Sequence, residues 1–267
     1  MNILKNKSAG IFLIAVLLGA VTFSGCSLFQ KRYEKTEKKE ISVNTAGRKK
    51  VVLNNTNGDI KVTKSSVDSV LIIKAEATFH LSKKELNEER ERIKITVDTS
   101  ENIINIKSDF VKENKIQIFN IKFGSEINYE LIVPEGLEVS LDNTNGKAEI
   151  LEVNNNVDVS ITNGSVKLTR TTGKIFVDIL NGKVKGDLDS MKGLEIKTTN
   201  GNVSLNLSST FSGKFIMETT SGKITKKGFD FRDVDDDKKY FKGTLGNGDA
   251  EVKIETTTGK ITLTKKH

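Results

Sequence analysis

The sequence TNGSVKLTRTTGKIFVDILNGKVKG, residues Thr162–Gly186, carries three glycines that lie nine residues apart. Gly164, Gly173 and Gly182 are each followed two residues later by valine or isoleucine. Asparagine precedes the first and the third of these glycines, whereas Thr172 precedes the second. The stretch therefore alternates two kinds of corner, and its true repeating unit is about 18 residues.

Both kinds of corner recur outside this stretch. The second series of glycines continues at steps of 20 residues through Gly193 and Gly213. Between the corners apolar and polar residues alternate, which is typical of strands with one buried face, and a period near 20 residues indicates stacked coils. The first series reads Gly146, Gly164, Gly182, Gly201 and Gly222, at steps of 18, 18, 19 and 21 residues, with further copies in Asn54–Val62 and Glu255–Leu263.

Three architectures were weighed for this repeat. Asn-Gly between alternating strands is also a strong hairpin signal, so spacing alone leaves an antiparallel meander open. A parallel solenoid explains in addition why asparagine returns at every second corner, because equivalent residues of successive coils stack about 4.8 Å apart. A calcium-binding nonapeptide array is disfavoured, because the repeat lacks the aspartate that such arrays place at a fixed position.

We therefore predict an all-β chain that forms a parallel β-solenoid. Residues 136–267 carry the coils, with an insertion near 226–247, and residues 41–135 form an N-terminal β-rich part with one short helix near 82–92. One row of corner side chains is expected to stack into an amide ladder, made of Asn145, Asn163, Asn181 and Asn200.

The N-terminus predicts export and lipidation. A basic start is followed by the apolar run Ala9–Phe23 and then by Cys26, which is the only cysteine. A short apolar stretch of this kind is typical of a secretory signal peptide, and small residues before a lone cysteine resemble a bacterial lipobox. We expect residues 1–25 to be the signal peptide, Cys26 to carry lipid, and residues 26–40 to be a flexible tether.

The formal charge of +7 is compatible with anionic partners. Lysine follows the corner glycine at many coils, which would give basic edges able to contact an anionic polymer, lipid head groups or an envelope protein. Nucleic acid is not expected, because export is predicted and no aromatic platform for bases accompanies the lysines. The lysines concerned are Lys147, Lys174, Lys183, Lys214, Lys223 and Lys260.

Catalytic and metal-binding patterns are scarce. The histidines are His80 and the last residue, His267, too few for a zinc site without cysteine partners. The run that contains Asp233, Asp235 and Asp237 lacks the glycine and glutamate that a calcium loop requires. We predict no cofactor, no metal and no enzymatic activity, with an envelope hydrolase built around His80 as a less favoured alternative.

The units T-N-G-x-V-x-L and T-T-G-K-I, together with Val133–Pro134 ahead of the coils, resemble a bacterial surface-protein family labelled "putative adhesin", whose function is unknown. The resemblance covers about Ile41–Lys265. It implies a right-handed parallel β-solenoid, similar to a single-stranded β-helix, at the cell envelope, and it brings no catalytic or binding residues with it.

The predicted function is accordingly a lipid-anchored, non-enzymatic scaffold for binding or adhesion at the bacterial cell membrane or cell surface. The alternative is a structural or envelope-stress accessory protein that contacts membrane partners.

Overall fold

The computed structural model describes residues 33–87, 93–110 and 125–266, and Arg32–His267 form one compact unit. Cys26 and His267 lie outside the described residues. Fifteen strands and one short helix are described, and each strand below is given with its bounds. The N-terminal elements are β1 (Tyr33–Asn44), β2 (Lys50–Asn57), β3 (Ile60–Lys64), β4 (Val70–Leu81), α1 (Lys83–Leu86), β5 (Ile93–Asp98), β6 (Ile103–Phe110) and β7 (Glu126–Val133). The remaining strands are β8 (Glu138–Leu151), β9 (Val157–Thr169), β10 (Lys174–Leu188), β11 (Gly193–Leu207), β12 (Gly213–Lys227), β13 (Arg232–Asp236), β14 (Tyr240–Leu245) and β15 (Ala250–Lys265).

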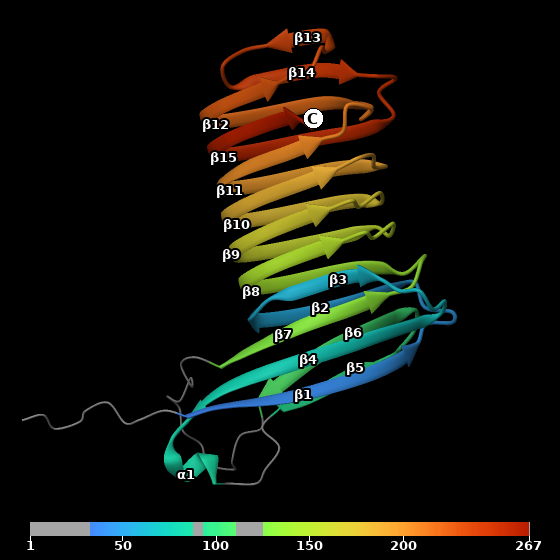
Figure 1. The fold of residues 1–267 in the computed structure, drawn as a ribbon, viewed down its shortest axis with the longest axis vertical. Helices are drawn as coiled ribbons and strands as arrows, with labels where there is room; N and C mark the ends of the chain where they lie inside the picture. The colour runs from blue at the N-terminus through green and yellow to red at the C-terminus, as the bar shows by residue number, and fades with distance from the viewer. Residues whose placement is uncertain (1–32, 88–92, 111–124, 267) are drawn as a thin grey trace, which may run out of the picture. The chain divides into compact units, whose positions relative to one another are not determined.

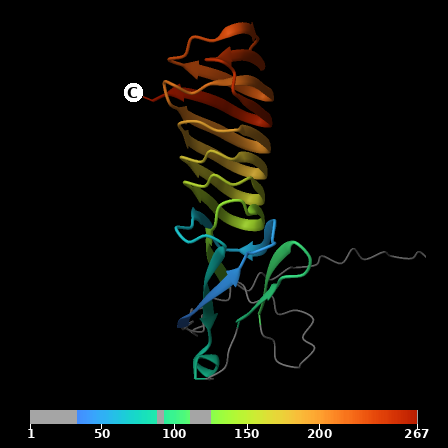
Figure 2. The same cartoon turned by 90° about the vertical axis from the view of Figure 1, so that its right-hand side faces the viewer.

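The strands stack in the order β1-β4-β7-β3-β8-β9-β10-β11-β15-β12-β14-β13, and the repeated coils follow one another in Figure 1 and Figure 2. All neighbouring pairs from β8 to β12 are parallel. This arrangement confirms the all-β class and the parallel β-solenoid, and it rules out the antiparallel meander for the coils.

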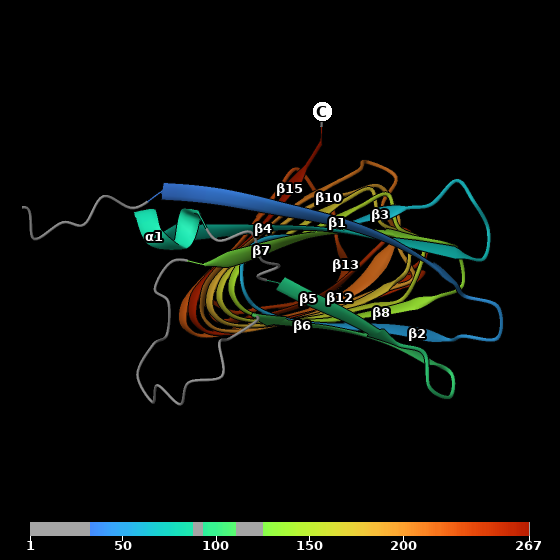
Figure 3. The same ribbon diagram turned by 90° about the horizontal axis from the view of Figure 1, so that it is seen from below.

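Each coil from β8 to β12 is a single long strand that turns at its corner glycine, which asparagine precedes in β8 to β11, Ser221 in β12 and Thr258 in β15. β2 pairs with the part of β8 before Gly146, and β3 pairs with the part after it. The two halves of each coil therefore belong to two layers, which Figure 3 shows in the view from below. We call the outward side of the halves before the corner glycine the first face, and the outward side of the halves after it the second face.

Inward side chains from the two layers form the core. In β10, Val177 comes from the half before the corner, and Val184 and Leu188 come from the half after it; all three are buried. Burying such a side chain stabilises the fold by about 1.5–3 kcal/mol. The alternation of apolar and polar residues that the sequence showed is thus the alternation between the core and the two faces.

The corner glycines allow the coils to approach at their tightest point. A Cβ atom added at Gly182 would lie 1.9 Å from the carbonyl oxygen of Gly164 in the coil below. The same clash, at 2.2 Å or less, would occur at Gly146, Gly164, Gly201, Gly259 and Gly222, each against the next corner of the stack. Because the obstacle is backbone, no side-chain movement would relieve it.

The corner asparagines form a continuous column of side-chain hydrogen bonds. Each Nδ2 donates to the Oδ1 of the coil below: Asn163 to Asn145 at 3.1 Å, Asn181 to Asn163 at 3.1 Å, and Asn200 to Asn181 at 3.0 Å. Asn145 in turn donates to Asn57 at 2.8 Å. The column thus begins one coil earlier than the sequence analysis placed it, because the copy in Asn54–Val62 stacks directly under β8.

The last strand of the chain lies inside the stack rather than at its end. β15 pairs in parallel with β11 on one side and with β12 on the other. The chain passes over one position after β11, forms β12, reverses through the β13–β14 hairpin, and returns to fill the gap. The longer step of 21 residues between Gly201 and Gly222 accompanies this jump.

The insertion expected near 226–247 forms that hairpin and closes the upper end of the core. β14 runs antiparallel to the first half of β12, and β13 runs antiparallel to β14. Phe231 lies edge-on to Phe241 at 4.8 Å and to Phe215 at 5.4 Å between ring centroids. This aromatic cluster covers apolar side chains that would otherwise meet water at the end of the stack.

The flexible tether predicted for residues 26–40 is wrong for residues 33–40, and residues 26–32 lie outside the described residues. Tyr33–Asn44 form β1, which pairs along its whole length with β4, because its alternating side chains suit a strand that has a partner. The helix expected near 82–92 is described as α1, Lys83–Leu86, and residues 88–92 lie outside the described residues. Below the coil formed by β2 and β3 the two layers continue separately, as β7-β4-β1 and as β6-β5.

Replacing Gly182 with alanine is expected to lower the free energy of unfolding by roughly 1–3 kcal/mol or more, because the added methyl group meets backbone in the coil below. Denaturant unfolding of the purified protein measures this change. Gly193→Ala is the matched control, since its Cβ atom would lie 3.6 Å from the carbonyl oxygen of Glu251, and it should shift stability by less than about 0.5 kcal/mol. Equal stability of the two variants would contradict the role given to the corner.

Candidate functional site

The second face is the most regular polar surface of the described unit. Each strand contributes three outward side chains to it, at alternate positions. We divide it into a lower half, on β1, β4, β7, β3 and β8 with the residue that leads into β3, and an upper half, on β9, β10, β11, β15 and β12. Each half has 15 outward positions, and their charges differ sharply.

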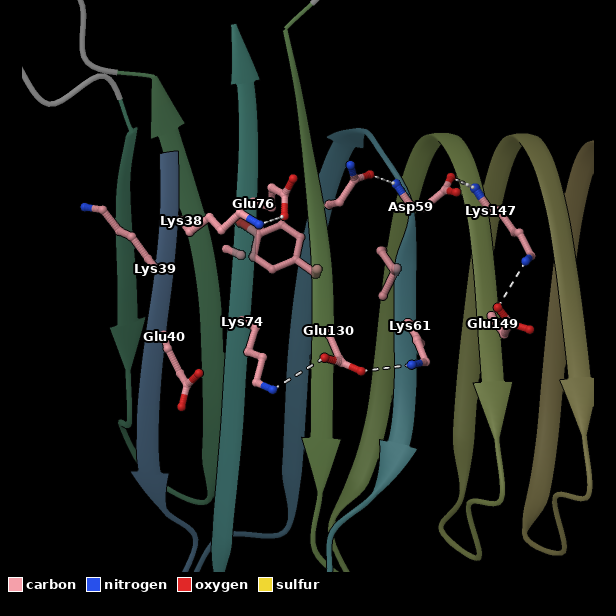
Figure 4. Close-up of a pocket in the computed structure, with 14 residues that line it drawn as sticks. Lys38, Lys39, Glu40, Asp59, Lys61, Lys74, Glu76, Glu130, Lys147 and Glu149 are labelled. Atoms are coloured by element: carbon pink, nitrogen blue, oxygen red, sulfur yellow. Dashed lines mark hydrogen bonds and ion pairs between the residues drawn. The ribbon is translucent and has the colours of Figure 1, made fainter. Parts of the chain in front are cut away.

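In the lower half, positive and negative side chains alternate from strand to strand. Glu130 on β7 pairs with Lys61 on β3 at 2.9 Å and with Lys74 on β4 at 3.7 Å. Glu149 on β8 pairs with Lys147 of the same strand at 3.1 Å and with Lys167 on β9 at 2.7 Å. Figure 4 shows Lys74, Glu130 and Lys61 side by side across the sheet, and Lys147 beside Glu149. The alternation neutralises the lower half within itself.

These lysines shift the acidity of the two glutamates. The hydrogen bond from Lys61 is the main cause that lowers the pKa of Glu130. For Glu149, hydrogen bonds from Lys167 and then from Lys147 lower the pKa. Both carboxylates are therefore held in their charged form, and each stabilises the fold while it is charged.

The lower half also contains an open hollow of about 660 Å³. Ten of its lining residues, labelled in Figure 4, are charged: Lys38, Lys39, Lys61, Lys74, Lys147, Glu40, Asp59, Glu76, Glu130 and Glu149. Lys38 pairs with Glu76 at 2.9 Å, so most of these side chains have partners of opposite charge. The hollow offers a ligand few side chains that are not already engaged.

In the upper half lysine predominates and acid is almost absent. The only acid among its 15 outward positions is Asp187, which pairs with Lys266. Eight positions are serine, threonine or asparagine, and none is apolar. The six lysines are Lys167, Lys183, Lys185, Lys223, Lys227 and Lys260. Of these, only Lys167 forms an ion pair with another described residue.

The six lysines proposed from the sequence thus fall into three environments. Lys183, Lys223 and Lys260 lie in the upper half, with Lys223 directly beside Lys260. Lys147 lies in the neutralised lower half. Lys174 and Lys214 lie on the first face, where Gly193 and Glu251 stand between them in the stack. The Gly-Lys lysines, which the sequence analysis placed on basic edges of the solenoid, are therefore divided between the two faces.

Sequence reasoning missed Lys167, Lys185 and Lys227 because they do not follow a corner glycine directly. They lie three or five residues after the corner glycines of β9, β10 and β12, which places them on the same side of their strands as the residue directly after the glycine. Period-two counting from each corner would have found them. The lack of acidic neighbours at Lys185 and Lys227, by contrast, depends on which strands adjoin one another.

The first face carries mixed charges. An open hollow of about 670 Å³ lies on it, lined by acids and lysines in similar numbers. Lys197 pairs with Glu195 at 2.8 Å and lies 5.3 Å from the ring centroid of Phe176. On β8 to β12 the outward positions of the first face hold eight acids and four lysines, so this face carries no excess of positive charge.

The residues considered for chemistry lie apart from one another. His80 is exposed on β4 opposite Glu34 and lines neither hollow. Asp233 and Asp235 are exposed on β13. Among the described residues no group of three or more histidine, cysteine, aspartate and glutamate side chains is placed to hold a metal ion. No described helix is long and apolar enough to cross a membrane.

Comparison with known families agrees with this architecture. The family model described as Toastrack DUF4097 matches residues 124–264, which is more than half of the chain. The chain therefore belongs to the Toastrack family, whose function is unknown. The matched segment begins near β7 and includes all the coils from β8 to β15.

Three solved structures are similar at low identity. A "putative cell adhesion protein" from Clostridium sporogenes is 15% identical, with a TM-score of 0.47, over 87% of this chain and 100% of that chain. A "putative adhesin" from Parabacteroides merdae is 12% identical, with a TM-score of 0.31, over 87% and 97%. A "putative lipid binding protein" from Parabacteroides distasonis is 10% identical, with a TM-score of 0.27, over 87% and 97%. A comparison with curated proteins finds no match.

Replacing Glu149 with glutamine is expected to lower stability at pH 7 by up to about 1 kcal/mol, the usual range for exposed ion pairs. Because the pKa of Glu149 is lowered on folding, its contribution is complete above the ordinary value of 4.5 and is lost as the pH falls through the lower folded value. Unfolding midpoints measured from pH 7 down to pH 3 should therefore converge with those of the wild type.

Asp142→Asn is the matched control for this variant. Asp142 lies on the same strand but on the first face, between Asn54 and Ser160. No ion pair of Asp142 with another described residue is present, so Asp142→Asn should change stability at pH 7 by less than about 0.5 kcal/mol. A loss in Glu149→Gln that persisted undiminished at pH 3 would show that packing, and not charge, accounts for the effect.

Proposed function

We propose that this protein is an exported, lipid-anchored scaffold of the bacterial cell envelope, which binds a partner through the outer surface of its coils and catalyses no reaction. The observation that carries the proposal is the extent of the second face. Its outward side chains repeat over ten adjoining strands at the spacing of the sheet. Such a surface is suited to many weak contacts along an extended partner.

The use of side chains within the unit supports a binding role. The corner asparagines are engaged with one another, and the charged groups of the lower half are engaged in ion pairs. His80 is exposed opposite Glu34 and lines neither of the two hollows, whereas the hydrolase alternative would need a histidine, a carboxylate and a hydroxyl together in a substrate pocket. The groups left for recognition are those of the upper half.

The N-terminal sequence supports the location. The short apolar run Ala9–Phe23 and the lone Cys26 have the pattern of a lipoprotein signal. Lipid on the cysteine would hold the protein at the membrane, because each buried methylene contributes about 0.8 kcal/mol and two acyl chains suffice for stable anchoring. The solenoid would then be presented outside the membrane.

Cys26→Ala is expected to abolish incorporation of radiolabelled fatty acid and to move the protein from the membrane fraction to the soluble or secreted fraction of bacterial cells. Ser27→Ala is the matched control, since it changes the neighbouring residue and leaves the thiol in place. Export is measured on the same cells by adding protease from outside after the envelope has been made permeable. Unchanged labelling of Cys26→Ala would refute the lipid anchor. Full protection of the solenoid from the protease would refute export.

A further inference from the structure

We propose that the upper half of the second face is the binding surface of this protein, and that its partner is a linear polymer that carries phosphate groups. This inference rests on the proposed function and names the partner that the scaffold binds. It concerns Lys183, Lys185, Lys223 and Lys260, with Lys167 and Lys227 at the margins.

The two halves of this continuous surface differ sharply in charge. The lower half has four lysines and five acids at its 15 outward positions, whereas the upper half has six lysines and one aspartate. Both halves use the same strand spacing and the same alternation. Paired charges are sufficient to solvate the lower half. The excess of lysine in the upper half is therefore not needed for solvation.

Lysines within the upper half repel one another. Lys223 and Lys260 occupy register positions on adjoining strands, and so do Lys167 and Lys185. Adjoining strands are about 4.8 Å apart, well within the screening length of about 10 Å at 0.1 M salt. Like charges at this spacing disfavour the folded state, and a bound polyanion would relieve that cost.

Hydroxyl and amide groups lie between the lysines. Asn202 and Ser204 on β11 separate the lysines of β10 from those of β15, and Thr262 and Thr225 adjoin each other on β15 and β12. Such side chains donate hydrogen bonds to phosphate oxygens. A surface that combines ammonium, hydroxyl and amide donors and has a single acid suits phosphate better than it suits a neutral glycan.

The dimensions favour a linear polymer over a membrane surface. From β9 to β12 the upper half spans four strand intervals, or about 19 Å, and its three outward positions on each strand span about 13 Å. None of the outward positions is apolar, whereas surfaces that lie on a bilayer insert apolar side chains. The large hydrophobic side chains that are exposed lie elsewhere: Val67, Leu180, Ile216 and Val234.

The acids nearest to this surface are engaged elsewhere. Asp187 and Asp189 both pair with Lys266. Asp236 on β13 pairs with Lys226 at 2.6 Å, whose ammonium also lies 4.1 Å from the ring centroid of Phe241. These carboxylates therefore do not neutralise the upper-half lysines on β10 and β15.

The test measures binding of the full-length chain, held in a nonionic detergent, to immobilised poly(glycerol phosphate). One variant removes four charges from the upper half, and a control variant removes four charges from the first face and its edge, so that both have the same net charge. The upper-half variant is Lys183→Gln, Lys185→Gln, Lys223→Gln and Lys260→Gln. The control variant is Lys50→Gln, Lys174→Gln, Lys192→Gln and Lys214→Gln. Thermal unfolding verifies that both remain folded.

The wild type is expected to bind, with an affinity that falls steeply as salt rises, because bound phosphates release counterions. The upper-half variant should lose about tenfold or more in affinity. The control variant should lose less than about threefold, because its charges lie on the other side of a two-layer stack about 10 Å thick and are screened.

Four outcomes would overturn the proposal: no binding of the wild type, equal loss in both variants, equal binding to poly-L-glutamate, or tighter binding to phosphatidylglycerol vesicles than to the polymer. The last would identify a membrane as the partner. Polymer binding does not depend on Cys26. If the protein is exported but does not bind the polymer, the polymer proposal fails and the envelope location stands. If it binds the polymer but is not exported, only the location is refuted.

Discussion

The close approach of backbone at the corner glycines is the constraint on which the rest of the structure depends. A methyl group at Gly182 would overlap the carbonyl oxygen of the coil below at 1.9 Å, so only glycine permits neighbouring coils to remain in hydrogen-bonding contact there. From β8 to β11 the asparagine before each glycine lies directly above its equivalent in the coil below and donates a hydrogen bond to it. Steric exclusion at the corners, joined from Asn57 to Asn200 by the amide column, fixes the register of the coils, and the register decides which side chains become neighbours on both faces.

That register explains why the two halves of the second face differ in charge. Equivalent positions of neighbouring strands lie side by side. A lysine beside a glutamate therefore forms an ion pair, as Lys61 does with Glu130, whereas a lysine beside a lysine does not, as at Lys223 and Lys260. The lower half is stabilised by its own charges. The upper half retains positive charge and donor groups that a phosphate polymer would satisfy. In the proposed binding mode, the lower half contributes to stability and the upper half to recognition along a single sheet.

Much of the fold was accessible from the sequence because the corner signal is local and repeated. Thr162–Gly186 contains both corner types, and the return of asparagine at every second corner predicted parallel stacking. The position of β15 was not accessible, since the repeat in Glu255–Leu263 matches any place in the stack equally well. β1 was taken as part of a tether because its Lys and Glu alternate without an apolar stripe. The upper half was found only in part, because its lack of acids depends on the strand order.

The order of the coils is the claim on which the second face depends, and disulfide trapping tests it most directly. With Cys26 replaced by serine, cysteines at Ser204 and Thr262 occupy register positions on adjoining strands, about 4.8 Å apart and within the range for a disulfide. Cysteines at Ser204 and Thr225 lie two strands apart, at about 9.6 Å. Under mild oxidation the first pair should cross-link and the second should not. Cross-linking of the second pair in place of the first would show that β12 stacks directly on β11, and would contradict the account.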